Sequence, residues 1–137
     1  MRFSLLAAGI LVISAGAGWR GEGQAAKAVH RESPFACDRL ALDPAARHRH
    51  FDVLGPALAA AHKSVRELAD GFEFEFPQDR TTVSQVLEFA NGERLCCPFF
   101  DIDVRIEREG GSIWLRLTGR EGTKQFIKGD FARWMHS

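Results

Sequence analysis

The sequence predicts an α+β fold in which helices cover one face of a four-stranded antiparallel sheet. Two stretches, 72–76 and 100–107, alternate apolar and charged residues, as strands with one buried face do. Each pairs with a second short strand-like stretch across a turn, which indicates two hairpins. Apolar residues at three- and four-residue steps precede, separate and follow these hairpins, which indicates helices. The predicted order is α-ββ-α-ββ-α in a two-layer sandwich.

The first helix is expected from about 44 to 63. Asp43 suits its N-cap, and Pro44 suits the first helical position. Gly55-Pro56 lies inside the helix, so a kink or a short break is expected there, because proline removes a backbone donor. One face carries the residues at helical steps: Arg47, Phe51, Leu54, Leu58 and Ala61.

The first hairpin joins 65–68 to 72–76 through the turn residues Asp70-Gly71. Its second strand places three phenylalanines on one face and two glutamates, Glu73 and Glu75, on the other. We expect the phenylalanine face to be buried and the glutamate face to be solvated.

The second helix is expected from about 79 to 96, capped by Asp79. It must end near Cys97, because Pro98 disfavours helical backbone in the residue before it. Its buried face is expected to carry Val83, Val86, Leu87 and Ala90.

The second hairpin joins 100–107 to 113–117 through Gly110-Gly111. A last helix is expected from about 121 to 134.

Length and charge limit the function. The chain has 137 residues, the size of one domain. Its 18 basic residues balance its 18 acidic residues. Because phosphate binding needs a basic surplus on one face, nucleic acid is not expected as a partner.

The N-terminus is typical of a secretory signal peptide. Arg2 is followed by an apolar run to Ile13 and by small residues at 15–17. We expect 1–17 to be removed, or cleavage as late as residue 28, with an uncleaved anchor as the alternative. The run is too short and too broken by glycine for a stable membrane span. The remaining chain divides into a disordered spacer, 18–36, and one α+β domain, 37–137, in the periplasm or outside the cell.

The three cysteines are the main candidates for chemistry. Cys96 and Cys97 are adjacent, and Glu93 lies one helical turn before them. The first helix begins soon after Cys37 and the second ends at the cysteine pair, so antiparallel helices would bring the three thiols together. In an oxidising compartment thiols tend to pair, and an odd number leaves one unpaired.

Several functions are compatible with these thiols. A helix C-terminus carries partial negative charge, which raises a thiol pKa and disfavours a nucleophile. The leading prediction is therefore that Cys37, Cys96 and Cys97 bind a soft metal ion such as Zn, Cu(I) or Hg, or change redox state. One alternative is a non-catalytic interaction domain with a structural Cys37 disulfide. Another, less favoured, is a cysteine-dependent enzyme with Glu93 as acid or base. His48 and His50 are two residues apart, which does not suit a metal pair on one helix face.

Four blocks of this chain form a distinctive pattern: Cys37 with the helix from Asp43-Pro44, then 70–72, then the E-x-x-C-C-P-F block 93–99, then 115–124. Together they resemble a family of small bacterial proteins of unassigned function. Related stretches are similar to tails of mercury-resistance-type regulators. The resemblance covers about 37–128. It implies that five residues form one group in the folded protein: Cys37, Cys96, Cys97, Glu93 and Arg47.

Overall fold

The computed structural model describes residues 32–136, and the predicted signal peptide lies outside them. Helices and strands follow in the order η1 (Arg39–Ala41), α1 (Pro44–His48), η2 (Arg49–Leu54), α2 (Gly55–Ala61), β1 (Ser64–Glu67), β2 (Gly71–Phe76), α3 (Arg80–Cys96), β3 (Asp101–Ile106), β4 (Ile113–Thr118), α4 (Thr123–Asp130) and η3 (Ala132–Trp134). The predicted α+β class and the order α-ββ-α-ββ-α are confirmed.

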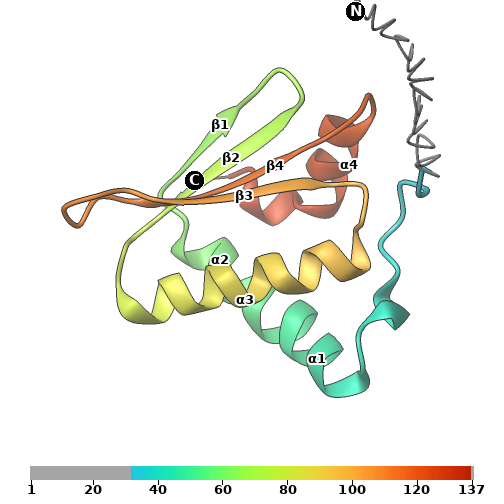
Figure 1. Cartoon of the computed structure of the whole chain (residues 1–137), viewed down its shortest axis with the longest axis horizontal. Coiled ribbons are helices and arrows are strands. Elements are labelled where there is room, and N and C mark those ends of the chain that lie inside the picture. Colours follow the sequence, from blue (N-terminus) through green and yellow to red (C-terminus); the bar gives the residue numbers. More distant parts are fainter. Residues whose placement is uncertain (1–31, 137) are drawn as a thin grey trace, which may run out of the picture. The chain divides into compact units, whose positions relative to one another are not determined.

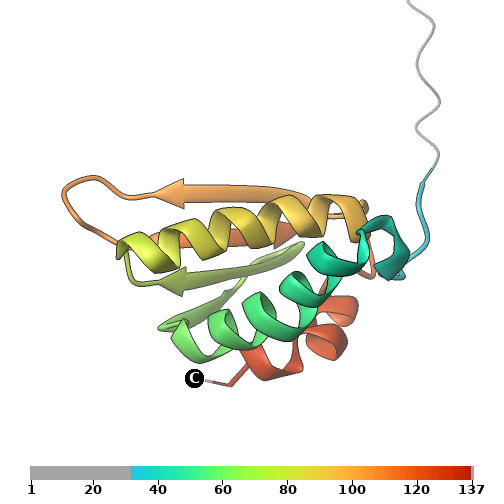
Figure 2. The ribbon, with the colours of Figure 1, turned by 90° about the horizontal axis from the view of Figure 1, so that it is seen from below.

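The four strands form one antiparallel sheet in the order β1-β2-β4-β3. The two hairpins therefore join through their later strands, with Gly71 opposite Thr118 and Phe76 opposite Ile113. The helices lie together on one side of this sheet (Figures 1 and 2). No helix among residues 32–136 has the length and apolar character needed to cross a membrane.

The core lies between the sheet and the helices. Phe72, Phe74 and Phe76 are at most 2% exposed, which confirms the predicted buried face of β2. Phe74 and Phe76 meet the ring of Trp134 edge to face. Residues of η3 thus close the core against the central strand.

The opposite face of β2 is not solvated as predicted. Glu73 is 1% exposed, and its carboxylate forms ion pairs with Arg66 of β1 and Arg116 of β4. The neighbouring Glu75 accepts hydrogen bonds from the hydroxyls of Ser64 and Ser112. Because β2 lies between β1 and β4, polar side chains on or beside both of these strands cover its glutamates.

The first helical segment runs without a gap from Pro44 to Ala61, but its middle six residues, Arg49–Leu54, form a π-helix. Pro56 has no backbone N–H for the carbonyl four residues earlier, and the N–H of Gly55 bonds to His50, five residues earlier. The predicted distortion near Gly55-Pro56 is present as this π turn. It leaves His50, Leu54 and Leu58 as the buried residues of the segment.

The helix α3 confirms the predicted span and the Asp79 cap, whose carboxylate accepts from the N–H groups of Thr81 and Thr82. Leu87, predicted to be buried, is 47% exposed. The buried face is rotated toward Phe89, Gly92 and Glu93, because α3 packs on the π segment as well as on the sheet. This rotation directs Glu93 into the protein.

The last helix is shorter than predicted. α4 ends at Asp130, and Phe131 separates it from the 3₁₀ turn η3. Phe35, which the sequence analysis assigns to the spacer, packs its ring edge against Phe99 at 5.1 Å between centroids.

Candidate functional site

The C-terminus of α3 brings two distant parts of the chain together. The N–H of Cys97 bonds to the carbonyl of Glu93 and closes the helix. The N–H of Asp38 bonds to the carbonyl of Cys96, which fixes the residue after Cys37 against this helix end. Cys37 and Cys97 form a disulfide with Cα atoms 4.8 Å apart. Cys37 thus lies beside the cysteine pair, as the predicted antiparallel packing of the two helices requires.

Cys96 is the free cysteine, and it is fully buried. Its sulfur lies 3.7 Å from Cys97 Sγ and 3.9 Å from His50 Nε2. Adjacent cysteines project in different directions, so one bonds to Cys37 while the other faces the interior of the protein.

Four side chains form what we call the thiol cluster: Cys37, Glu93, Cys96 and Cys97. One ligand atom from each, three sulfurs and a carboxylate oxygen, lie within 4.8 Å of one another. Such a set can hold a metal ion once the disulfide is open, because thiolates and a carboxylate are metal ligands.

His50 is a residue of the site that the sequence analysis missed. Its Nε2 lies 3.0 Å from Glu93 Oε1, and both side chains are 3% exposed. The ring stacks on Phe89 with 4.5 Å between centroids. On a regular helix the spacing of His48 and His50 gives no signal. Two signals were present: the four-residue steps from His50 to Leu54 and from Leu54 to Leu58, and Gly92, a poor helix former placed where the imidazole packs against α3.

Burial sets the proton affinity of the cluster. Desolvation raises the pKa of Glu93, against the opposing effect of its hydrogen bond to His50. Desolvation, followed by the nearby Glu93 carboxylate, raises the pKa of Cys96 to about 12. The thiol of Cys96 therefore keeps its proton at neutral pH until an ion or another reaction removes it.

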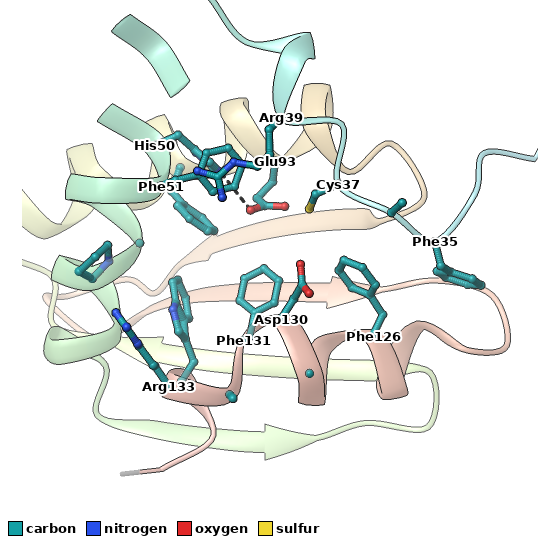
Figure 3. Close-up of a pocket in the computed structure, with 17 residues that line it drawn as sticks. Phe35, Cys37, Arg39, His50, Phe51, Glu93, Phe126, Asp130, Phe131 and Arg133 are labelled. Atoms are coloured by element: carbon teal, nitrogen blue, oxygen red, sulfur yellow. Dashed lines mark hydrogen bonds and ion pairs between the residues drawn. The ribbon is translucent and has the colours of Figure 1, made fainter. Parts of the chain in front are cut away.

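A pocket of about 750 Å³ opens beside the cluster. Its wall is rich in aromatic side chains from helices and from the segments beside them: Phe35, Phe51, Phe89, Phe126, Phe131 and Trp134. Cys37, His50 and Glu93 also line it, whereas Cys96 and Cys97 do not. In Figure 3 the Glu93 carboxylate lies between His50 and Cys37 on one side of the pocket, opposite the rings of Phe126 and Phe131.

Arg47 lies outside the thiol cluster. Its guanidinium donates to the carbonyls of Arg39 and Leu42, and so holds the loop that follows Cys37. His48 is exposed and pairs with Asp52, four residues later.

Comparisons of the chain with protein-family models, with curated proteins and with solved structures found no match. The resemblance of the 93–99 block to a bacterial family therefore stays a prediction.

Proposed function

We propose that this domain is a redox-gated site for a soft metal ion. The observation that carries the proposal is the convergence of three sulfurs and one carboxylate oxygen within 4.8 Å at a buried helix end. While the Cys37–Cys97 disulfide is intact, neither of its sulfurs can become a thiolate, the form of cysteine that binds metal ions. Opening the disulfide supplies the missing ligands.

The gating step is a two-electron reduction by two thiol groups, of one dithiol or of two separate thiols. These groups lose two S–H bonds and gain one S–S bond, while the Cys37–Cys97 bond breaks and each of its sulfurs gains a proton. Three thiols then converge with Glu93. A soft ion that binds displaces the thiol protons into solvent, so binding itself overcomes the high pKa of Cys96.

The donor set favours thiophilic ions. Three thiolates suit Cu(I) or Hg(II), and three thiolates with the Glu93 carboxylate complete a four-ligand set of the kind that Zn²⁺ takes. His50 would orient the carboxylate through its hydrogen bond, as the hydrogen-bond partners of metal ligands commonly do.

The disulfide itself favours one second candidate, a structural domain that keeps Cys37 and Cys97 permanently paired. Their sequence separation is 60, so the bond closes a long loop and constrains the unfolded chain. A cysteine-dependent enzyme has less support, because Cys96 is fully buried and its pKa is about 12.

A metal titration before and after reduction separates these functions. The protein is reduced with a phosphine, the phosphine is removed, and Zn²⁺, Cu(I) and Hg²⁺ are added in separate equilibrium dialyses. We expect one tightly held ion per reduced chain and none on the oxidised chain. Cys96→Ser keeps the disulfide but should weaken binding at least about tenfold. Equal metal content in both redox states would leave the structural candidate.

Glu93→Gln tests the four-ligand set. The amide keeps the shape of the side chain but is a far weaker metal ligand. Zn²⁺ affinity should therefore fall more than Cu(I) affinity, which needs only the three thiolates.

Export remains part of the proposal, on the strength of the apolar run after Arg2 and the small residues at 15–17. Mass spectrometry of the protein from the producing cell should find 1–17, or a segment ending as late as residue 28, removed. A soluble cytosolic form that retains Met1 would contradict export and leave the metal site untouched.

A further inference from the structure

The pocket beside the thiol cluster has a composition that the metal site does not require. Its volume of about 750 Å³ lies in the usual range for small-molecule sites, and six aromatic rings contribute to its wall. Two of these rings, Phe126 on α4 and Phe131 directly after it, lie opposite the side that carries Cys37 and Glu93 (Figure 3). A metal ion held by three sulfurs and a carboxylate would use none of these rings.

The pocket gives access to one sulfur of the disulfide and not to the other. Cys37 lines it and is partly exposed, whereas Cys97 is fully buried and does not line it. Thiol–disulfide exchange needs a collinear approach of the incoming thiolate to the attacked sulfur, so access decides which sulfur reacts. A small reagent that enters through the pocket meets Cys37.

The same wall contains a buried carboxylate, that of Glu93, with one oxygen that accepts no hydrogen bond from the described residues. Glu93 Oε1 bonds to His50, but Oε2 is buried and has no hydrogen-bond partner among residues 32–136. Glu93 lines the pocket and belongs to the thiol cluster. A ligand that ends in a hydrogen-bond donor, such as a thiol, offers that oxygen a partner next to the disulfide.

We propose that the pocket admits a small thiol that carries an aromatic group, and that this thiol opens the disulfide at Cys37. The proposal rests on the redox gating above and names its reductant by chemical class. The aromatic group packs among the rings of the wall and its sulfur reaches Cys37 Sγ.

The chemistry balances without a further reagent. The incoming sulfur bonds to Cys37 Sγ, the Cys37–Cys97 bond breaks, and the proton of the incoming thiol ends on Cys97 Sγ. A second molecule of the thiol attacks the mixed disulfide, which releases the small disulfide and leaves Cys37 as a thiol. Two thiols thus supply the two electrons that the gating step needs.

The test compares two alkyl thiols of similar sulfur reactivity, 2-phenylethanethiol and ethanethiol, on the oxidised full chain. Acid quenching followed by peptide mass spectrometry gives the rate of mixed-disulfide formation and the modified cysteine. We expect the phenyl-bearing thiol to react about tenfold faster or more, at Cys37, because burial of its ring in the pocket raises its local concentration at the disulfide.

Gly129 provides a matched pair of variants. It lines the pocket, and a Cβ added there meets no heavy atom within 4 Å. Gly129→Phe should occupy part of the pocket and remove most of the advantage of the phenyl thiol, so that the ratio of the two rates approaches one. Gly129→Ala should keep the advantage. A far-UV circular dichroism spectrum like that of the wild-type protein shows that each variant is folded.

Three outcomes would overturn the proposal: equal rates for the two thiols, modification at Cys97, or a full phenyl advantage in Gly129→Phe. Its failure is distinct from failure of the proposed function. If the phosphine-reduced chain binds metal but the two thiols react at equal rates, the metal site is supported and the aromatic reductant is not. If the phenyl thiol reacts faster but the reduced chain binds no metal, the thiol-binding pocket is supported and the metal site is not.

Discussion

The imidazole of His50 packs directly against the backbone of Gly92. A Cβ built on Gly92 would lie 2.4 Å from His50 Nδ1, closer than carbon and nitrogen atoms can approach. The ring cannot move aside easily, because it stacks on Phe89 and bonds to Glu93. The absent side chain at residue 92 is therefore what lets the His50–Glu93 pair form inside the protein.

Gly92→Ala is the first prediction that follows from this contact. Alanine favours a helix over glycine by up to about 1 kcal/mol, but the collision with a held ring costs about 1–3 kcal/mol. We expect a net loss of unfolding free energy, measured by urea denaturation. Gly129→Ala is the control, because it also lies in a helix but its Cβ is free of contacts, so stability should be unchanged or slightly higher. A Gly92→Ala variant as stable as the control would contradict the packing of His50.

How far the sequence predicts this site depends on the residue. The alternation in 72–76 predicted the buried strand, and the proline after Cys97 predicted the end of α3. Both features depend on local backbone geometry, which the neighbouring residues determine. The burial of His50 follows from helical steps of four to Leu54 and Leu58, which are both buried, and it was missed because His50 was compared only with His48. Its contact with Glu93 was not predictable, because it joins residues 43 apart in the sequence. Glu73 is a different case. Its alternation is that of a solvated face, but arginines from two neighbouring strands cover it.

The acid stability of the domain should depend on Glu75. Hydrogen bonds from Ser112 and Ser64, followed by that from Lys63, lower the pKa of Glu75 to about 2. Because the folded-state pKa lies below the unfolded value, near 4.5, ionised Glu75 stabilises the fold above that pH. The contribution declines as the pH falls from about 4.5 through 2.

Glu75→Gln measures this contribution. The unfolding free energy of the variant and of the wild-type protein is followed from pH 7 to pH 2. At pH 7 the value for the variant should be lower by about 1–3 kcal/mol. The two curves should converge toward pH 2, where Glu75 is protonated in the unchanged protein as well. A constant difference across this range would mean that the hydroxyl and lysine contacts do not act on the ionised carboxylate.

Cys96 should resist alkylation in the folded protein. Its sulfur is fully buried and its pKa is about 12, so at pH 8 about one molecule in ten thousand carries the thiolate. Treatment of the native, oxidised protein with iodoacetamide should add no label within minutes. Denaturation before treatment should add one label, and denaturation with reduction should add three. Rapid single labelling of the native protein would contradict the burial of Cys96.

Opening the disulfide should destabilise the domain, and a soft metal should reverse much of the loss. The Cys37–Cys97 bond links residues 60 apart, and the chain-entropy account gives such a bond about 4 kcal/mol. Reduction should therefore lower the melting temperature clearly in the absence of metal. Because an ion that binds the native cluster and not the unfolded chain stabilises by mass action, added Zn²⁺ or Cu(I) should raise the melting temperature of the reduced protein.

The sulfur variants decide which bonds produce these shifts. Cys37→Ser should melt like the reduced protein in the absence of metal, and should not respond to a reductant. Cys96→Ser should retain the full response to a reductant, since its disulfide is intact, but after reduction it should recover much less stability on addition of metal. A chelator should lower the melting temperature of the reduced, metal-loaded protein and leave the oxidised protein unchanged. If metal fails to stabilise the reduced chain while reduction still destabilises it, the cysteine pair acts as a structural disulfide and the metal proposal is wrong.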